Sequence, residues 1–332
     1  MKQITTLGID LAKHVFQIAE FDQHQRMVSN QTVSRSKLLK QLANLPPARI
    51  GIEACGSAHY FHQRFTQMGH SVHMLPASFV KGFVYGNKHD RNDAKAIGLA
   101  VMHPEAPRVQ VKSEQQLHHQ ALLRVRQRRV DQRTACANQI RSILYEQGIL
   151  MSVGHRHLRR FDTGSLNQAL AQLIDDLISE FKQLDQQVAE SDKVIKRLVQ
   201  SNPIGQRLLE LPGFGVLNVL ASLVVNPNDF RNGRHYSAYL GLVPKQVGSG
   251  GKTTLQGVSK RGNTYHRQLL CHGARAFITC SKQTDHPLWQ WADRLRKRKN
   301  LNIAVLALAN RLARISWHIM RGEPFDQSKL AA

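Results

Sequence analysis

Apolar and polar positions alternate in short runs along the first 75 residues, and this pattern predicts a mixed α/β domain. Three apolar runs separated by polar turns predict an antiparallel meander of strands, at residues 4–9, 14–20 and 27–32. Helical and extended patterns then alternate, at residues 36–45, 49–54, 58–68 and 71–75. Three meandering strands followed by helix, strand, helix and strand predict an RNase H-like core, in which the later strands lie parallel to the first.

Two long helices are predicted in the middle of the chain by apolar residues at helical spacing. They cover residues 113–147 and 165–200, and the second approximates heptads over several turns. This pattern favours a helical hairpin or an intermolecular coiled coil. A plain intramolecular bundle fits the same pattern equally well.

A third region begins at the helix-breaking pair Asn202-Pro203. Apolar runs flank Leu211-Pro212-Gly213-Phe214-Gly215, an arrangement typical of a helix-hairpin-helix, whose second helix presents backbone amides to a phosphate. A plain turn between two helices is the alternative. A last apolar helix is predicted at residues 301–320. Together these elements predict three domains, at residues 1–110, 111–201 and 202–332.

The charge balance narrows the class of partner. Lysine and arginine outnumber aspartate and glutamate by 46 to 23, so the 332-residue chain carries a formal charge of +23. A folded chain this basic is expected to bind a polyanion, and nucleic acid is the leading candidate. A basic protein of a membrane surface is the competing class, but there is no apolar run near eighteen residues and no signal-peptide pattern, so the chain is expected in the cytoplasm. The four cysteines form no C-x-x-C pair, which argues against a zinc site and a disulfide framework.

Single carboxylates end two of the predicted strands. Leu7-Gly8-Ile9-Asp10 and Ile50-Gly51-Ile52-Glu53 each run from apolar residues into one acid. If the two strands are parallel neighbours, Asp10 and Glu53 emerge at the same edge of the sheet, where α/β folds bind ligands. Two acids there repel each other unless a cation lies between them. Taken alone, each acid is also explained as the turn residue that ends a strand.

A second pair of acids, Asp90 and Asp93, opens a helix that runs through Met102. Because they are three residues apart, they share one helix face and can point at one site. The ordinary alternative is Asp90 as the N-cap with Asp93 in the first turn. With Asp10 and Glu53 they complete four acids in the order D, E, D, D, which suits Mg²⁺ or Mn²⁺ in a nuclease-type site.

Basic residues and one serine supply the remaining candidates. Basic side chains on the first long helix suit phosphate contact, as does the run at residues 155–160, although such runs are often only solvated faces. From Gln256 to the end, fourteen lysines and arginines stand against four acids, which predicts a polyanion-binding surface. Ser249, between glycines and beside Lys252, is either a nucleophile on a mobile loop or part of a linker. The basic candidates are Arg124, Arg126, Arg128, Arg129, Lys252, Lys260, Arg261 and Arg267.

These motifs, in this order, resemble those of the Piv-type DEDD transposases of bacterial insertion sequences, a family of bridge-RNA-guided serine recombinases. The resemblance spans nearly the whole chain. Its marks are Gly8-Ile9-Asp10-x-Ala12-Lys13, Gly51-Ile52-Glu53-Ala54, Asp90-x-x-Asp93-Ala94, Leu211-Pro212-Gly213-x-Gly215, Ala238-Tyr239-Leu240-Gly241-Leu242-x-Pro244 and Ser249-Gly250-Gly251. It implies a RuvC-like N-terminal domain, a coiled-coil middle and a mainly α-helical C-terminal transposase domain with a helix-hairpin-helix.

Carried over residue by residue, the resemblance implies a role for each acid and for the serine. The acids Asp10, Glu53, Asp90 and Asp93 match the metal-binding positions, and Ser249 matches the nucleophile. The chemistry implied is Mg²⁺-assisted attack of the serine on a DNA phosphodiester, with a transient phosphoserine link before strands are exchanged and rejoined. The implied partners are donor and target DNA, a structured guide RNA and further copies of the chain, as a dimer assembling into a tetramer at the bacterial nucleoid. Gly213 and Gly215 are expected to contact nucleic acid.

The residues also leave rival functions open. A RuvC-like structure-specific nuclease needs the four acids but not Ser249. An architectural nucleic-acid-binding protein needs neither. Site-specific inversion of DNA is a further alternative to transposition.

Overall fold

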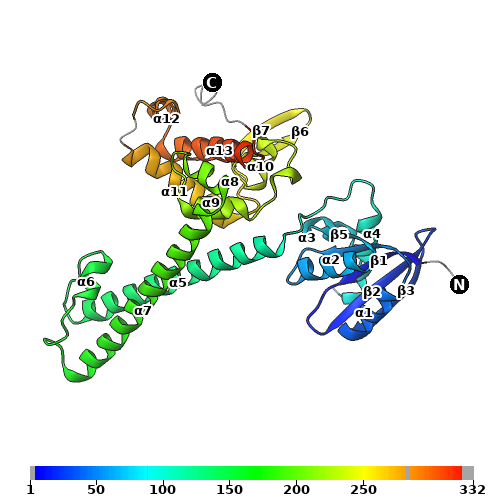
Figure 1. Ribbon diagram of the computed structural model, residues 1–332, viewed down its shortest axis with the longest axis horizontal. Coiled ribbons are helices and arrows are strands. Elements are labelled where there is room, and N and C mark those ends of the chain that lie inside the picture. The colour runs from blue at the N-terminus through cyan, green and yellow to red at the C-terminus, as the bar shows by residue number, and fades with distance from the viewer. Residues whose placement is uncertain (1–3, 88, 282–283, 324–332) are drawn as a thin grey trace. The chain divides into compact units, whose positions relative to one another are not determined.

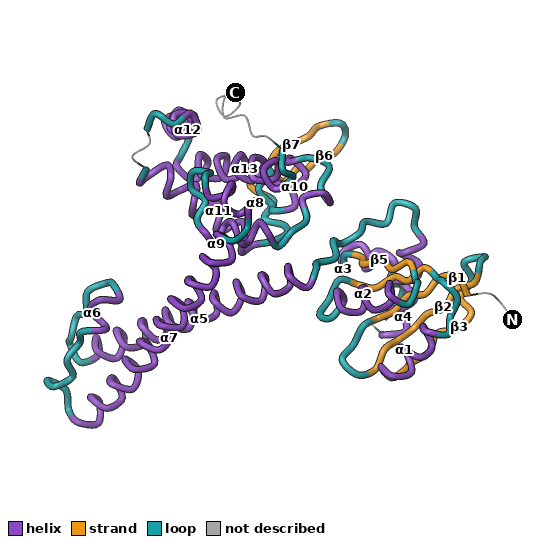
Figure 2. The backbone as a smooth tube through the Cα atoms, viewed as in Figure 1, coloured by secondary structure: helices purple, strands orange, loops and turns teal. Residues whose placement is uncertain are grey.

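The computed structural model describes residues 4–87, 89–281 and 284–323, so residues 324–332 of the predicted third domain lie outside the described part. The chain divides into two compact units, Met1–Ser113 and Glu114–Ala332 (Figure 1). Figure 2 shows a group of strands in the first unit and mainly helices in the second. The predicted mixed α/β N-terminal domain and the mostly helical remainder are therefore confirmed. In the described ranges, no helix combines the length and the apolar character that crossing a membrane requires.

A five-stranded sheet in the order β3-β2-β1-β4-β5 forms the first unit. Its strands are β1 Ile4–Asp10, β2 Val15–Asp22, β3 Met27–Ser34, β4 Arg49–Glu53 and β5 Ser71–Leu75. The first three strands pair antiparallel, β4 lies parallel to β1, and β5 lies parallel to β4. This confirms the predicted meander followed by parallel strands, and it places the carboxyl ends of β1 and β4 next to each other.

Helices cover both faces of this sheet. On one face, α1 Arg35–Ala43 and α2 Ala58–Gln67 pack over apolar strand residues that include Leu7, Ile9 and Ile52. The other face carries α4 Asp90–Met102, whose Ala94 packs against Ala19 and Phe21 of β2. Because side chains alternate along a strand, Gly8 and Gly51 lie on the α4 face, opposite to Ile9 and Ile52.

Three glycines let α4 approach the sheet closely. A Cβ on Gly8 would collide with the carbonyl oxygen of Ala94 and the backbone of Gly98, and a Cβ on Gly51 would lie 2.8 Å from Cβ of Val101. A Cβ on Gly98 would in turn strike the ring of Phe21. Gly8 and Gly51 are direct partners in the parallel pairing of β1 with β4, so one continuous flat patch receives the helix.

A long helical hairpin opens the second unit. Its arms are α5 Glu114–Glu146 and α7 Gln168–Gln200, which pack against each other within one chain (Figure 1). Arginine side chains of α5 bind acceptors on α7: Arg126 contacts the carboxylate of Asp192 at 2.5 Å, and Arg133 contacts that of Asp185 at 2.8 Å. The hairpin prediction is thus confirmed, with an intramolecular pairing of the two helices.

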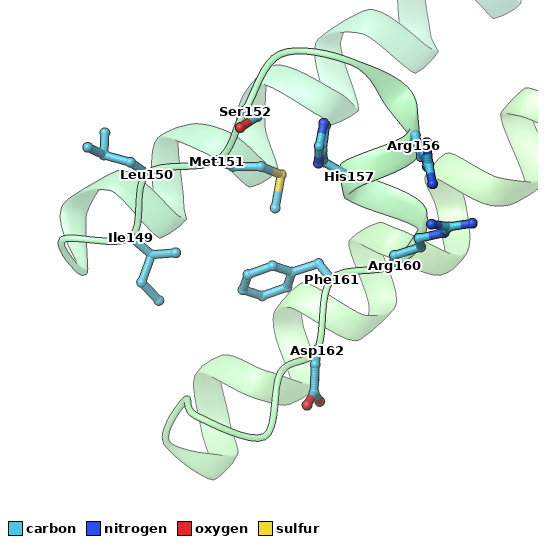
Figure 3. A pocket seen from close by; sticks show the side chains of 9 residues that line it. All are labelled: Ile149, Leu150, Met151, Ser152, Arg156, His157, Arg160, Phe161 and Asp162. Carbon is cyan, nitrogen blue, oxygen red and sulfur yellow. The ribbon is translucent and has the colours of Figure 1, made fainter.

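The tip of this hairpin contains the short helix α6 His155–Arg159 and a pocket of about 460 Å³. Figure 3 shows Met151, His157 and Phe161 around one hollow, with Arg156 and Arg160 beside each other at its rim. Among the residues that the structure describes, neither of these two guanidinium groups has a hydrogen bond or an ion pair. The hairpin's other end packs into the C-terminal core.

The C-terminal core is built from short helices around α13 Leu301–Met320. The other elements are α8 Pro203–Leu209, α9 Val216–Leu223, α10 Gly233–Tyr239, α11 Thr264–Cys280 and α12 Pro287–Arg298. Leu123 of α5 and Ile195 and Val199 of α7 belong to the same apolar cluster, so the hairpin's base and the C-terminal helices form one unit.

The glycine-rich stretch around Ser249 forms a β-hairpin, rather than the irregular loop or linker that the sequence predicted. Strand β6 Pro244–Ser249 pairs antiparallel with β7 Lys252–Val258. The two-residue loop between them, Gly250-Gly251, has positive φ at both positions, +57° and +77°, which is the backbone of a type I′ turn. Glycine adopts these angles without steric cost.

The glycine contacts under α4 generate a stability prediction. Gly8→Ala should destabilise the first unit by about 1–3 kcal/mol, because the new methyl group overpacks the contact with Ala94 and Gly98. Gly82→Ala is the matched control, since a Cβ there meets nothing within 4 Å and should change stability by less than about 0.5 kcal/mol. Hydrogen exchange of the β1 and β4 amides measures both effects. Equal exchange in the two variants would contradict the packing role.

Candidate functional site

Three carboxylates converge at the carboxyl end of β1. Asp10 is the last residue of this strand, and Asp90 and Asp93 lie in the first turn of α4. Each offers an oxygen within 4.8 Å of the other two. Hard carboxylate oxygens at this separation are the donor set that Mg²⁺ and Mn²⁺ take, so the residues fit a divalent cation.

Glu53 borders this cluster from the neighbouring strand. It ends β4 as Asp10 ends β1, and it stands two residues after Gly51, as Asp10 stands two residues after Gly8. Both acids therefore lie on the face that α4 covers. The charge of Asp93 raises the pKa of Glu53, second to burial, which places the two carboxylates within electrostatic reach. The structure thus brings together all four acids named from the sequence, three of them in close contact.

The cluster is electrostatically strained without a cation. Burial, followed in order by the charges of Asp93, Asp90 and Glu53, raises the pKa of Asp10 from its ordinary value of 3.8 to about 6. Partial burial and three neighbouring acids both disfavour the ionised form of Asp10. A divalent cation reverses this balance, because it replaces repulsion between the acids with attraction to a shared charge.

Helix α4 begins with a different cap from the one that its acids suggest. The N-cap is His89, whose ring Nδ1 accepts a hydrogen bond from the amide of Arg91 at 3.1 Å. The N-cap interpretation of Asp90 is therefore wrong. With this amide already bound, neither carboxylate caps the helix in the described structure, and both face the cluster.

Ser249 belongs to the second unit, in the strand just before the Gly250-Gly251 turn. Its partner across the hairpin is Lys252, an exposed residue at the start of β7. The hairpin is exposed along nearly all of β7, with Leu255 66% accessible. A two-stranded hairpin with so little packing presents its turn to an approaching partner.

The four arginines named on α5 divide into two kinds. Arg126 binds Asp192, and Arg129 donates to the hydroxyl of Ser191 at 2.8 Å, so both side chains join α5 to α7. Arg124 and Arg128 are exposed. Only the latter two present their charge outward.

The C-terminal candidates also differ in their surroundings. Lys260 and Arg261 are exposed, whereas Arg267 is buried and donates to the carbonyl oxygens of Leu240 at 2.9 Å and Arg261 at 2.7 Å. The Arg267 guanidinium thus fastens a loop to the end of α10. Gly213 packs its backbone against Gly273 between helices, while Gly215 is exposed as the N-cap of α9.

Sequence reasoning missed the polar residues that surround the acids. Gln17, the direct partner of Asp10 on β2, is 5% exposed and lies between the buried apolar residues Phe16 and Ile18. An isolated buried amide of this kind requires hydrogen-bond partners, and that requirement was the available signal. Strands β6 and β7, on either side of Gly250-Gly251, were missed as well, although Gly-Gly between extended runs is a known hairpin signal.

Comparisons with known proteins identify similar sequences along almost the whole chain. A family model described as "Transposase IS116/IS110/IS902 family" matches residues 205–290, and a DEDD model of IS110 type, described as "Transposase", matches residues 7–148. The first match includes Ser249, and the second includes the four acids.

Several curated relatives match end to end. A "Probable family 20 transposase" of Pseudomonas aeruginosa is 36% identical over 330 residues, covering 96% of this chain and 98% of the relative. The "Transposase for insertion sequence element IS1111A" of Coxiella burnetii is 34% identical, covering 96% of this chain and 90% of the relative. The "Transposase for insertion sequence element IS1328" of Yersinia enterocolitica is also 34% identical, covering 96% and 97%.

The raised pKa of Asp10 generates a pH-dependent prediction. The carboxyl group of Asp10 binds its proton more tightly in the folded state than in the unfolded chain. Protonation therefore contributes fully to stability below pH 4, and this contribution is lost as the pH rises through about 6. In EDTA, Asp10→Asn should therefore stabilise the protein above pH 6, by about 1 kcal/mol after discounting for partial exposure. The gain should fade towards pH 4. Thermal unfolding across this pH range measures it.

Magnesium should reverse the order of stability of the wild type and Asp10→Asn. Added Mg²⁺ should raise the unfolding temperature of the wild type but not that of Asp10→Asn, because the variant loses one of the three close ligands. Glu105→Gln, three residues beyond the end of α4, removes an exposed acid and should respond to Mg²⁺ as the wild type does. Equal stabilisation of all three proteins would place the metal elsewhere.

Proposed function

The chain belongs to the IS116/IS110/IS902 transposase family and is a DNA transposase of an insertion sequence, and we propose that it cuts and rejoins DNA through Ser249 with the help of a divalent metal. The observation that carries the proposal is the convergence of Asp10, Asp90 and Asp93 in a chain that aligns end to end with transposases. Both the metal ligands and the serine lie within the regions that the family models match.

The first unit is proposed to be an RNase H/RuvC-like metal-binding domain. Its sheet order, with an antiparallel meander followed by two parallel strands, supports this assignment. Asp10, Asp90 and Asp93 would hold Mg²⁺ or Mn²⁺, with Glu53 at the border of the site. Bound there, the ion would act as a Lewis acid on phosphate oxygens and neutralise charge in the transition state.

Ser249 is proposed as the nucleophile. Its oxygen would form a bond to a DNA phosphorus while the bond from phosphorus to one sugar oxygen breaks, leaving one strand end linked to the protein. A hydroxyl of the incoming strand would then attack the same phosphorus and release the serine. The exposed strand β7 and the exposed Gly250-Gly251 turn support this role, because they leave this end of the hairpin open to a DNA duplex.

The remaining partners complete the proposal. The acids and Ser249 belong to different units, and we propose that they act on the same phosphate in a composite site assembled in a dimer or tetramer. Selection of donor and target DNA is assigned to a structured guide RNA. The charge of +23 supports binding of these nucleic acids, and exposed Arg124, Arg128, Lys260 and Arg261 are proposed contacts.

A structure-specific nuclease is the second candidate. The observation in its favour is that the acid cluster is complete within Met1–Ser113, without any contribution from the second unit. Such an enzyme would cleave DNA with the metal alone and would leave no DNA bound to the protein.

Replacement of the serine distinguishes the two candidates. Ser249→Ala should lower strand exchange by roughly three orders of magnitude or more and abolish DNA-linked protein, because nothing else supplies the covalent intermediate. Thr254→Ala, in the partner strand of the same hairpin, is the control and should retain both. The readout is protein trapped on labelled DNA after denaturation. Metal-dependent cleavage and rejoining that persist in Ser249→Ala would favour the nuclease.

The pocket at the hairpin tip yields a prediction for nucleic-acid binding. Its unpaired arginines suit phosphates, and its apolar and aromatic lining suits bases. Arg156→Gln with Arg160→Gln should weaken binding and reduce the slope of log affinity against log salt by about 1.4 to 1.8, the value for two phosphate contacts. The charge-matched control replaces Lys182 and Lys193, two exposed lysines of α7, by Gln. An equal loss in both double variants would mean that only net charge matters.

A further inference from the structure

A chain of polar side chains connects the edge of the sheet to Arg91, in the first turn of α4. The hydroxyl of Thr32 donates to Oε1 of Gln17 at 2.7 Å, and Nε2 of Gln17 donates to Oδ1 of Asn30 at 2.6 Å. Nδ2 of Asn30 then donates to the carbonyl oxygen of Arg91 at 2.9 Å. The guanidinium of Arg91 completes the contact in the other direction, donating to the backbone oxygen of Asn30 at 3.2 Å.

Strand register places this chain on the same face as the acids. Gln17 is the direct partner of Asp10 across β1 and β2, and Asn30 pairs with Ala19 across β2 and β3. Paired residues point to the same side of a sheet, so Gln17 and Asn30 both lie beneath α4. At the other end of the chain, Arg91 lies between Asp90 and Asp93 in the sequence.

From these contacts we propose that Asn30 is a positioning residue for the metal site, acting through Arg91 on Asp90 and Asp93. This inference rests on the proposed metal-binding role of the acids. Asn30 holds the first turn of α4 through two hydrogen bonds. Its side-chain amide donates to the backbone oxygen of Arg91, and its own backbone oxygen accepts from the Arg91 guanidinium. Gln17 in turn holds the Asn30 amide with its oxygen towards the sheet and its nitrogen towards the helix.

The arrangement matters because the acids repel one another. Repulsion between Asp10 and the two acids of α4 pushes the start of the helix away from the strand, and the glycine contacts hold the helix only further along, at Ala94 and Gly98. The Asn30 contact opposes this displacement at the first turn itself. Partners that orient metal ligands in this way typically change metal affinity by 10- to 100-fold when they are removed.

Metal affinity of the full-length protein tests the proposal. Free Mn²⁺ is measured by electron paramagnetic resonance during titration of the wild type, Asn30→Ala and Gln17→Met. Asn30→Ala should raise the dissociation constant about tenfold, and Gln17→Met, which keeps the length of the side chain but loses both hydrogen bonds, should shift it in the same direction. Strand exchange by Asn30→Ala should recover as Mn²⁺ is raised, because the ligands themselves are intact.

The matched control is Asn44→Ala. Asn44 donates from its side-chain amide to the carbonyl oxygen of Lys40 at 3.1 Å, so it makes the same type of bond at the end of α1, on the opposite face of the sheet. It should leave Mn²⁺ affinity within about twofold of the wild type, and unfolding temperatures of the two alanine variants in EDTA should agree. Wild-type affinity in Asn30→Ala, or an equal loss in Asn44→Ala, would overturn the positioning role.

A further variant, Asp10→Asn, tests separately whether the acids bind the metal at all. Asp10→Asn should lose the Mn²⁺ site that the wild type shows. If Asp10→Asn binds Mn²⁺ as the wild type does, the acids are not the metal site, and the proposed function fails together with this inference. If Asp10→Asn loses the ion and Asn30→Ala keeps it, only the positioning role fails.

Discussion

Repulsion between carboxylates is the interaction around which the first unit is arranged. Asp10 must lie beside Asp90 and Asp93 against an unfavourable electrostatic energy, which is visible in the raised pKa of Asp10. Several features together impose this proximity: the parallel pairing of β1 with β4, the glycines under α4, and the cap supplied by His89 in place of an acid. The first unit therefore holds a preformed but strained site, and a divalent cation is the ligand that relieves the strain.

Much of this fold is predictable from the sequence because its determinants are local. Short apolar runs, helical spacing and breaks at proline and glycine identified the strands and the two long helices, and the matching ends of two parallel strands placed Asp10 beside Glu53. The cap of α4 was not predictable in this way, because it depends on the extended backbone of His89 rather than on residue preference. The β6–β7 hairpin was missed because its strands are polar and exposed, so that apolar alternation gives no signal there.

The basic residues show most clearly that local sequence does not predict long-range contacts. Along α5, Arg126 and Arg128 are two positions apart, yet the first is bound to α7 and the second is exposed. Which face of a helix meets its partner depends on the register of two helices, and the residues that this register pairs can be far apart in the sequence: Arg126 and Asp192 are 66 positions apart. The local sequence therefore shows that a residue is charged but not which residue its side chain contacts. Arg267, whose charge is enclosed by backbone oxygens in the C-terminal core, is a second instance.

The glycines beneath α4 have an evolutionary consequence. Mutational decay of an insertion-sequence copy can remove an acid without disturbing the packing of Gly8, Gly51 and Gly98, because these glycines set the distance between the helix and the sheet. Such a copy would still fold and, in an assembly of several subunits, would occupy a place without contributing a metal site. In the assembly proposed above, a decayed gene that keeps the three glycines would therefore act as a dominant inhibitor of its active relatives, whereas one that loses them would supply no folded subunit.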